Sequence, residues 1–402
     1  MNARVLILLD NDFSRDARVE REGRALAGAG HRVTVLCFEG PGLPREEERD
    51  GVRVLRVPRL QMPRFLPPGF QLAWYLLRLA RDGGTGAMER RARSLTADVV
   101  HACDLRTLAL GVRLARRLRA RLVYDCHDLW AEFYTSPEPW RLGTPITPRL
   151  LGWLWHRVER KFIRRPDETI VVSDAMADHL VGRYGIPRPV VVRNCPPFRE
   201  SGEGRLREEL GAPEGARVVL YHGVALFKRA LGKIVEAAEL LPENCLLALR
   251  CTGSEARIAL LKEMAAQSPA RARIRFLDPV PQETLAEHTA GADVGLALLE
   301  DVQINQRVAL PNKIFEYMRS GVPVVASAMP EMRRVIETER VGGLVHELTP
   351  EAIARAIREV LDAPDHAAMR ERARTAARER HNWSIEAEKL LALYARVLAG
   401  AP

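Results

Sequence analysis

Short runs rich in Val, Ile and Leu alternate along the whole chain with longer segments in which apolar residues recur at helical spacing. The short runs occupy residues 4–9, 32–37, 98–101, 122–125, 168–172 and 190–193, and then 217–221, 246–251, 273–276, 294–298 and 323–326. Such alternation predicts parallel strands covered by helices, because a crossover between parallel strands needs a helix-length connection. The predicted fold class is therefore α/β.

The alternation is interrupted by the polar segment 195–204, which is rich in Pro and Gly. Pro and Gly break both strands and helices, so this segment is a natural linker. We predict one doubly wound domain over residues 1–197 and a second over residues 198–382. Residues 383–402 predict an amphipathic C-terminal helix that could cover either domain, including by crossing back to the first.

Three shorter segments carry further expectations. Residues 16–27 predict an amphipathic helix closed by Gly28 and Gly30, because Gly favours the left-handed conformation at a helix end. Residues 147–148, Thr-Pro, predict the start of another helix, since Pro is favoured at the first helical position. The acidic triplet at residues 46–48 predicts a solvated loop.

The charge of the chain is concentrated in its first half. The 402 residues include 61 basic and 52 acidic side chains, and residues 53–165 alone hold 22 basic and nine acidic ones. Aromatic side chains accompany these cations in residues 63–81 and in the helix predicted from residue 147. Such a surface suits an anionic membrane, although packing of both segments into the core is an equal alternative. Nucleic-acid binding is disfavoured, because no recognition motif accompanies the charge.

Other features bear on the compartment. The six cysteines form no CxxC pair and no zinc-ligand spacing, which is typical of a reducing compartment. The N-terminal apolar run is too short for a signal peptide, and no 18 consecutive apolar residues occur. We expect a cytoplasmic protein, peripheral at the inner face of the membrane if the basic surface binds lipid.

The second domain carries residues suited to a nucleotide diphosphate. Gly223 follows a predicted strand, and Lys228 and Arg229 stand where the next helix should begin, so backbone and cations can approach phosphates. Residues 311–312, Pro-Asn, start another helix, whose free N–H groups lie beside Lys313. One turn later, Glu316 can accept hydrogen bonds from sugar hydroxyls.

The first domain has a different set of polar residues. It lacks a Gly-x-Gly-x-x-Gly turn, so a dinucleotide cofactor is disfavoured. The Asp-x-Asp triplet at residues 10–12 is weak evidence for a metal, and we expect no essential metal. Polar side chains predicted at strand ends form a rim that could bind an acceptor, although Asp16 and Asp104 could equally cap helices. The rim comprises Asp16, Arg18, His101, Asp104, Asp125 and His127.

Residues 311–318, Pro-Asn-Lys-Ile-Phe-Glu-Tyr-Met, followed by residues 321–325, Gly-Val-Pro-Val-Val, resemble the donor-site signature of retaining GT-B glycosyltransferases of family 4. Residues 14–19, 99–104 and 124–130 resemble acceptor-domain segments of one branch of that family, and residues 223–229 and 279–281 resemble its donor domain. The resemblance covers nearly the whole chain. It implies two Rossmann-like domains facing across a cleft.

The resemblance implies roles for individual residues. Arg229 and Lys313 would neutralise the departing diphosphate, Glu316 would hold the ribose, and Val280 would offer backbone hydrogen bonds to the base. His127 matches the histidine that contacts the donor sugar. The implied catalytic residues are thus Arg229, Lys313 and His127, and the donor-binding residues are Gly223, Lys228, Val280, Ala309, Leu310, Pro311, Asn312 and Glu316.

The chain departs from the family pattern at three positions. Val308 replaces the first glutamate of the Glu-x7-Glu motif, so backbone groups near Ala309 and Leu310 would have to hold the donor sugar. Val224 stands where relatives often have Arg, which leaves more of the phosphate charge to Arg229. Cys103 replaces a second histidine.

The expected activity is transfer of a sugar from a nucleotide-diphosphate sugar to a hydroxyl acceptor. The basic first half favours a lipid-linked saccharide or a surface-polysaccharide precursor as acceptor, and a soluble metabolite is the alternative. Outside this class, a sugar-nucleotide epimerase of the same fold and a non-catalytic donor-binding subunit stay open.

Overall fold

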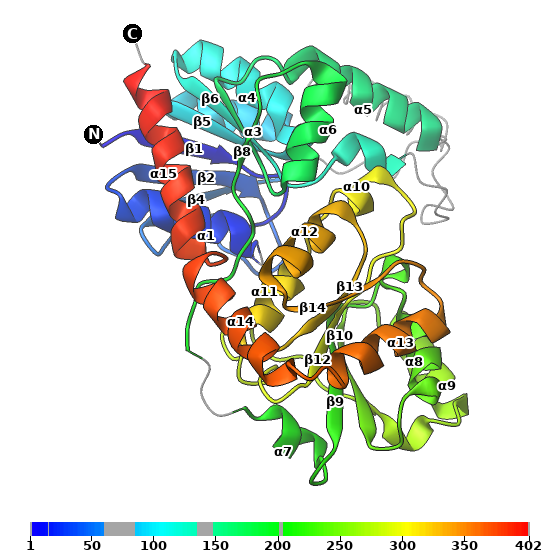
Figure 1. Ribbon diagram of the computed structural model, residues 1–402. Helices are drawn as coiled ribbons and strands as arrows, with labels where there is room; N and C mark the ends of the chain where they lie inside the picture. Colours follow the sequence, from blue (N-terminus) through cyan, green and yellow to red (C-terminus); the bar gives the residue numbers. More distant parts are fainter. Residues whose placement is uncertain (1, 15, 60–84, 135–147, 201–203, 401–402) are drawn as a thin grey trace. The chain divides into compact units, whose positions relative to one another are not determined.

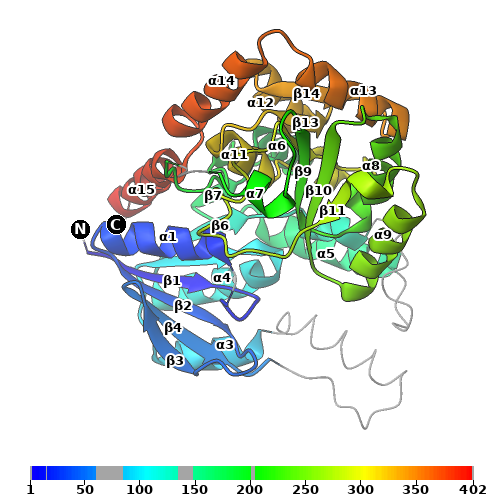
Figure 2. The same cartoon turned by 90° about the horizontal axis from the view of Figure 1, so that it is seen from below.

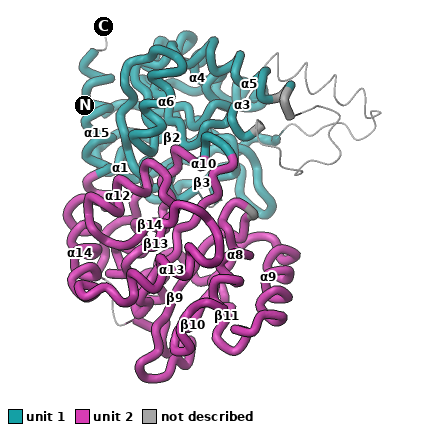
Figure 3. The backbone as a smooth tube through the Cα atoms, turned by 45° about the vertical axis from the view of Figure 1, so that its right-hand side comes forward, with its two compact units in different colours: residues 1–193, 303–305, 386–402 teal, residues 194–302, 306–385 magenta. Residues whose placement is uncertain are grey.

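The computed structural model describes residues 2–14, 16–59, 85–134, 148–200 and 204–400. The chain forms two compact units (Figure 3). Unit 1 consists of Met1–Arg193, Gln303–Asn305 and Glu386–Pro402, and unit 2 consists of Asn194–Val302 and Gln306–Ile385. Each unit is a largely parallel sheet covered by helices, which confirms the predicted α/β class.

Unit 1 is built on an eight-stranded sheet in the order β3-β4-β2-β1-β5-β6-β7-β8. Its strands are β1 (Arg4–Leu8), β2 (Arg32–Phe38), β3 (Glu46–Arg49), β4 (Val52–Val57), β5 (Val99–Cys103), β6 (Arg121–Cys126), β7 (Glu168–Val171) and β8 (Val190–Val191). Its helices are α1 (Ala17–Gly28), α3 (Gly86–Arg91), η1 (Ala92–Ser94), α4 (Asp104–Leu118), η2 (Trp130–Tyr134), α5 (Pro148–Phe162), α6 (Asp174–Tyr184) and most of α15 (Trp383–Ala399).

The helices of unit 1 cover both faces of the sheet. Helix α1 connects β1 to β2 and α4 connects β5 to β6, so the two crossovers run in opposite directions from the centre of the sheet. Because such crossovers are right-handed, α1 and α4 lie on opposite faces. Figures 1 and 2 both show α15 beside α1. The C-terminal helix therefore belongs to the α1 face of unit 1.

The prediction of a solvated loop at the acidic triplet is wrong. Residues Glu46–Arg49 form β3, which pairs antiparallel with β4 at the edge of the sheet. Glutamate has low strand propensity, but here it is offset by cross-strand ion pairs, such as Glu46 with Arg53 at 3.2 Å and Glu47 with Arg56 at 2.6 Å. This strand could not be predicted from local composition, because the arginines that pair with its glutamates lie on the neighbouring strand β4.

Unit 2 contains a six-stranded parallel sheet in the order β11-β10-β9-β12-β13-β14. Its strands are β9 (Arg217–Val224), β10 (Cys245–Thr252), β11 (Ile274–Phe276), β12 (Val294–Ala297), β13 (Val324–Ser327) and β14 (Gly342–Val345). Its helices are α7 (Leu206–Leu210), η3 (Phe227–Arg229), α8 (Leu231–Ala237), η4 (Ala238–Leu240), α9 (Glu255–Gln267), η5 (Arg271–Arg273), α11 (Asn312–Arg319), α12 (Pro330–Glu339), α13 (Pro350–Leu361) and α14 (His366–Glu379), and α10 (Ile304–Arg307) joins the two units in sequence.

Two apolar cores lie on the two faces of this sheet. One contains buried residues of α8, α9 and α13, including Ile234 and Ile357. The other contains buried residues of α11, α12 and α14, including Phe315 and Met332. The central strands are buried on both faces and read as continuous apolar runs, which explains why their positions were predictable from sequence.

Some expectations fall on parts of the chain that are not described. The basic aromatic segment 63–81 lies outside the described residues. The helix predicted from residues 147–148 is α5, which begins at Pro148. Within the described ranges, no helix combines the length and the apolar character that crossing a bilayer requires.

Candidate functional site

The direction of the chain connections reverses at the centre of the unit 2 sheet. Strands β9 and β12 are neighbours, and the helices that follow them, α8 and α11, pack on opposite faces. Ligands of open α/β sheets bind at such a switch point, beyond the carboxyl ends of the strands. Gly223 lies at the end of β9 and Lys313 in the first turn of α11, so both predicted residues lie at this point.

Lys313 places a buried amino group at the switch point. Its residue is 7% exposed, and its Nζ has no hydrogen-bond acceptor among the described residues. The Nζ lies 3.8 Å from the centre of the Tyr221 ring, which provides a cation–π contact. Burial, and next the charge of Arg229, hold the pKa of Lys313 well below its ordinary value. An anion beside Nζ would offset the cost of burying this charge.

Gly223 lets the backbone approach the lysine. Its φ of +123° lies in a region that residues with a side chain rarely adopt. A Cβ at this position would lie 3.4 Å from Lys313 Nζ. The glycine therefore keeps open the space in front of the ammonium group.

Lys228 and Arg229 lie in the short helix η3, between the end of β9 and α8. Both are half-buried. The backbone N–H of Glu300 donates to the carbonyl of Lys228 at 2.9 Å, which ties η3 to the loop after β12. Burial raises the pKa of Tyr221, and the charge of Arg229 partly opposes this rise. Arg229 therefore acts electrostatically on both Tyr221 and Lys313.

The carboxylate of Glu316 lies one turn into α11 and is 13% exposed. It accepts a hydrogen bond from Gln282 Nε2 at 2.7 Å, and His222 Nδ1 lies 3.7 Å away. Burial and next the charge of Lys313 hold the pKa of His222 well below its ordinary value, so this ring is neutral. Because Gln282 follows Val280 in the chain, this contact brings the predicted base-binding loop to the predicted ribose-binding carboxylate.

The remaining predicted donor residues precede or begin α11. Leu310 is 7% exposed and packs with the apolar core, and Ala309 is half-buried against it. Pro311 is the N-cap residue and has no side-chain cap hydrogen bond. Asn312 is exposed at the first helical position. The backbone N–H groups at this end of α11 therefore have no side-chain acceptor at the N-cap, as an anion site requires.

Unit 1 contains a buried network of charged side chains at the carboxyl ends of β5 and β6. Arg18 donates to both oxygens of Asp125, with Nε–Oδ2 3.2 Å and Nη2–Oδ1 2.9 Å. The same guanidinium lies 3.0 Å from Glu22 and donates to the carbonyl of Val192 at 2.8 Å. Arg18, Glu22 and Asp125 are at most 4% exposed, so they form an ion-paired cluster in the interior.

His127 joins this cluster to the surface. Its Nε2 lies 2.6 Å from Asp125 Oδ2, and its Nδ1 lies 3.7 Å from Asp104 Oδ2. Its side chain is 16% exposed. Burial would lower the pKa of His127, but Asp125 and Asp104 raise it to about 10. The ring is therefore a cation at neutral pH and can face an anionic or hydroxyl group.

Asp104 and Asp125 respond to this environment in opposite ways. Burial raises the pKa of Asp104 to about 6. Burial would also raise the pKa of Asp125, but the charges of Arg18 and His127, and next the contacts of the carboxylate with the rings of His101 and His127, hold it well below its ordinary value. Asp125 is therefore the permanent anion of the cluster. Asp104 accepts from the backbone N–H of His127 at 3.0 Å and fixes the loop that carries it.

The predicted acceptor residues occupy distinct positions. Arg18, His101 and Asp125 are buried behind His127 and do not reach the surface, which favours a supporting role for them. Asp16 caps α1 by accepting from the backbone N–H of Val19 at 3.1 Å. Helix capping, one of the two alternatives open for Asp16, is thus what its contacts show. Acceptor binding by these residues stays a prediction.

Side chains that the sequence analysis missed complete both sites. In unit 2 they are Tyr221, beneath Lys313, and Gln282, on Glu316. In unit 1 they are Glu22 and Tyr394, which contact Arg18 and His101. Glu22 lies one helical turn after Arg18, so its spacing was a usable signal. No local signal connects Tyr394 with His101, because 293 positions separate them.

The arrangement of potential metal ligands does not favour a cation. The groups His101, Cys103, Asp125 and Glu22, Asp125, His127 each bring three ligand atoms within 4.8 Å. However, both oxygens of Asp125 already accept from the Arg18 guanidinium, whose charge would repel a divalent ion. In the Asp-x-Asp triplet, Asp10 pairs with Arg106 at 2.6 Å. These residues fit an ion-pair network.

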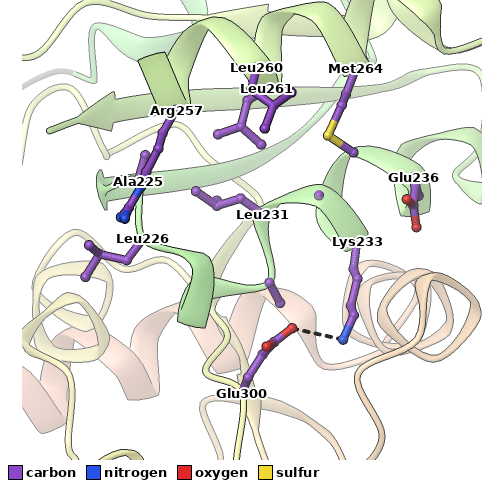
Figure 4. A pocket seen from close by; sticks show the side chains of 12 residues that line it. Ala225, Leu226, Leu231, Lys233, Glu236, Arg257, Leu260, Leu261, Met264 and Glu300 are labelled. Atoms are coloured by element: carbon purple, nitrogen blue, oxygen red, sulfur yellow. Dashed lines mark hydrogen bonds and ion pairs between the residues drawn. The ribbon is translucent and has the colours of Figure 1, made fainter. Parts of the chain in front are cut away.

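An apolar cavity of about 260 Å³ lies beside η3 and α8 (Figure 4). Leu226, Leu231, Leu261 and Met264 contribute to its lining. The ion pair between Lys233 and Glu300, 2.9 Å long, lies at one side. Because the lining is mainly apolar, this cavity does not suit a sugar or a phosphate.

Comparisons with known proteins agree with this geometry. Residues 17–195 match the family model "Glycosyltransferase Family 4", and residues 203–380 match "Glycosyl transferases group 1". A D-inositol 3-phosphate glycosyltransferase from Thermobispora bispora is 28% identical over 377 residues, which cover 88% of this chain and 82% of that protein.

Solved structures show the same fold. Sucrose-phosphate synthase from Thermosynechococcus elongatus has a TM-score of 0.80 at 18% identity, covering 99% of this chain and 100% of that one. Anabaena HepE in complex with UDP and glucose has a TM-score of 0.73 at 15% identity, covering 98% and 100%. The two family models together span most of the sequence and include both sites, so the chain belongs to glycosyltransferase family 4 and is a nucleotide-sugar-dependent glycosyltransferase.

Proposed function

We propose that the protein takes a sugar from a uridine diphosphate sugar and transfers it, with retention, to a hydroxyl acceptor at an anionic membrane surface. The observation that carries the donor half of the proposal is Lys313. A buried ammonium group without an acceptor, next to a positive-φ glycine and a helix N-terminus, is a site prepared for an anion.

The cations around this position suit a diphosphate. Arg229 lowers the pKa of Lys313, so the two charges oppose each other when no anion is present. A diphosphate between them would turn this repulsion into two attractions. Charge that develops on a leaving diphosphate would be stabilised by groups already in place, which is commonly the largest contribution to catalysis. Glu316 and Gln282 would then receive the ribose.

The choice of uridine as the base rests on solved relatives. HepE has been crystallised with UDP and with UDP-glucose, and a trehalose-phosphate synthase of the same fold is described as UDP-forming. In this chain, Val280 is half-buried in the loop that Gln282 anchors to Glu316, and its backbone would face the base. Binding of other nucleotides is an outcome that the test below distinguishes.

The acceptor half of the proposal rests on helix α5. One face of the helix is buried through Trp155 and Glu159, whereas the opposite face exposes Leu150 (43%) and Trp153 (53%). Exposed cations continue the same stripe at three- and four-residue spacing: Arg157, Arg160, Lys161 and Arg164. Arg157 also lies over the Trp153 ring, 4.9 Å from its centre. An apolar end followed by cations suits the interface of an anionic bilayer.

A soluble acceptor is the second candidate. The name of the Thermobispora bispora relative specifies inositol 3-phosphate, a phosphorylated polyol. A cationic His127 at the surface of unit 1 would suit an acceptor phosphate as well as a hydroxyl group. A transferase acting on such an acceptor would have no need of the exposed stripe on α5.

The donor site can be tested without an acceptor. UDP, GDP, ADP, TDP and their glucose conjugates are compared by thermal shift and calorimetry on wild type, Lys313→Met and Arg229→Ala. Lys262→Met, which removes an exposed lysine from α9, is the control. We expect uridine nucleotides to bind wild type and the control about tenfold to a hundredfold more tightly than Lys313→Met. Equal binding by Lys313→Met would overturn the site assignment.

Turnover separates the proposal from its alternatives. An epimerase converts the nucleotide sugar without an acceptor, whereas a transferase requires one beyond slow hydrolysis. A protein that binds the donor and releases no nucleotide diphosphate with lipid extracts or inositol phosphate would be a binding subunit.

The membrane contact is tested by sedimentation with phosphatidylcholine vesicles, with and without phosphatidylglycerol. Wild type should sediment with the anionic vesicles at low salt, and a variant combining Trp153→Ala, Arg160→Glu and Lys161→Glu should not. A second variant with Lys262→Glu and Arg271→Glu makes the same charge change in unit 2. Sedimentation that does not differ between the two variants would remove α5 from the proposal.

A further inference from the structure

We propose that Tyr394 of the C-terminal helix and His101 of β5 are positioning residues for His127, acting through the shared carboxylate of Asp125. The proposal rests on the proposed function only for its effect on turnover, because the network lies within unit 1. It gives helix α15 a part in the site that its position in sequence does not suggest.

The first link joins α15 to the sheet. The hydroxyl of Tyr394 lies 2.8 Å from His101 Nδ1, and both side chains are completely buried. The two rings are nearly parallel, with an interplanar angle of 16°. Tyr394 is therefore held against His101 both by a hydrogen bond and by packing.

The second link follows from where the protons must be. Burial raises the pKa of Tyr394 well above its ordinary value, so the phenol keeps its proton. We assign this proton as the donor to His101 Nδ1, which leaves a ring proton of His101 on Nε2. That nitrogen lies 3.6 Å from Asp125 Oδ2 and 3.9 Å from Glu22 Oε2. The tautomer thus directs an N–H toward the carboxylates.

The third link is the carboxylate of Asp125. The oxygen Oδ2 that faces His101 also accepts from His127 Nε2 at 2.6 Å. Arg18 fixes the orientation of the same carboxylate through both oxygens. Without the hydrogen bond from Tyr394, the His101 ring would be free to turn away from Oδ2. Asp125 would then lose the N–H on that side and would shift its hydrogen bond to His127.

His127 is the member of the described network whose side chain is partly exposed. His127 is 16% exposed, whereas the side chains of Arg18, Glu22, His101 and Asp125 are at most 4% exposed. Among these five described side chains, a change inside the cluster therefore reaches a ligand through His127. The charged and titratable groups that act on His127 or pair with its partners are Asp125, Asp104, Arg18, Glu22, His101 and Asp128.

The test uses the full chain with ¹⁵N-labelled histidine. Long-range ¹H–¹⁵N spectra report the tautomer of each ring, and His127→Gln and His101→Phe assign the two residues. We expect Tyr394→Phe to shift the His101 Nδ1 resonance, because that nitrogen loses its hydrogen bond, and to shift the His127 Nε2 resonance through Asp125. Tyr184→Phe is the matched control, since it removes another buried phenol of unit 1, bonded to Glu159, outside the network. It should change neither histidine.

Kinetics give an independent readout. Loss of one neutral hydrogen bond predicts that Tyr394→Phe lowers kcat about threefold to tenfold, while nucleotide affinity is unchanged. In a double-mutant cycle, the effect of Tyr394→Phe should vanish in the His101→Phe background, because Tyr394 acts through that ring. Additive effects would overturn the proposal, as would an unchanged His127 resonance in folded Tyr394→Phe.

The two proposals fail separately. If wild type binds no nucleotide sugar, the proposed function fails, but the histidine spectra still test the network. If wild type is active and Tyr394→Phe leaves both the spectra and kcat unchanged, only the positioning role is lost.

Discussion

The ammonium nitrogen of Lys313 and the aromatic ring of Tyr221 are 3.8 Å apart, and both groups are largely shielded from water. The ring provides part of the solvation that a buried cation loses, but it does not supply a negative charge. Lys313 is therefore a group whose protonation should change when an anion arrives.

This relationship predicts that binding of a nucleotide diphosphate takes up protons. The pKa of Lys313 lies well below its ordinary value in the free protein, and a neighbouring diphosphate should raise it. Calorimetry in buffers with different ionisation enthalpies should show proton uptake, increasing as the pH rises through the pKa of the free protein.

Lys313→Met provides the control for this proton uptake. It should bind the nucleotide more weakly and show no buffer dependence from this position. A depressed lysine pKa also means that the unfolded state binds more protons, so the contribution of Lys313 to stability should rise with pH up to about 10.5. Lys313→Met should lack this contribution, which is measured as the difference between the pH profiles of the two proteins. Identical proton uptake in both proteins would contradict the account.

Gly223→Ala should weaken nucleotide binding and destabilise unit 2. The φ of +123° costs an alanine about 1–3 kcal/mol, and its Cβ would lie 3.4 Å from Lys313 Nζ. Urea unfolding and nucleotide titration measure the two effects. Gly182→Ala, in helix α6 with open space around the new Cβ, should be neutral or stabilising.

Arg229→Ala should lower kcat about a hundredfold or more, whereas Lys228→Ala should have a much smaller effect. The charge of Arg229 lowers the pKa values of both Lys313 and Tyr221. Lys228 is not among the groups that shift these two pKa values. Removing Arg229 should also raise the pKa of Lys313 and reduce the proton uptake described above. Steady-state kinetics of the two variants distinguish these roles, and equal losses would argue against them.

His127 predicts a specific dependence of stability on pH. Its pKa is raised from 6.5 to about 10, so its contribution is fully present below pH 6.5 and is lost as the pH rises through about 10. The loss is at most about 1.4 kcal/mol for each pH unit in this window. The free energy of unfolding, measured with urea between pH 7 and 10, should therefore fall less steeply with pH in His127→Gln than in wild type.

A histidine with the opposite shift serves as the control. Burial lowers the pKa of His179 below 6.5, so it is uncharged throughout the same window. His179→Gln should leave the slope above pH 7 unchanged. A slope that is the same in His127→Gln and wild type would show that His127 is not held as a cation.

The parts of the fold that sequence patterns predicted are those determined by local composition. The central strands are buried on both faces, and the start of α11 at Asn312 follows from the proline before it. Strands β3, β4 and β14 were missed. Strands β3 and β14 contain acidic or glycine residues that do not favour strands themselves and are stabilised by pairing with β4 and β13, whereas β4 has a local apolar pattern that could have been used.

The candidate sites show the same division. Gly223, Lys313 and Glu316 stand near strand ends or helix starts, so their proximity could be inferred from the topology. The depth of burial of Arg18 and Asp125 could not, because it depends on side chains from α1, β6 and the chain after β8 packing together. Tyr394 is the extreme case, since its partner His101 lies in another part of the sequence.

Strand β3 has a consequence for how the molecule behaves in a crowded solution. Among the described strands it pairs only with β4, so its other side offers unpaired backbone groups at the margin of the eight-stranded sheet. A bare margin of this kind can recruit a strand from another molecule and start aggregation. The charged side chains of β3 make such recruitment costly, since an added strand would remove from water the ion pairs that Glu46 and Glu47 make with arginines. The acidic triplet thus opposes pairing of this edge strand with a strand of another molecule.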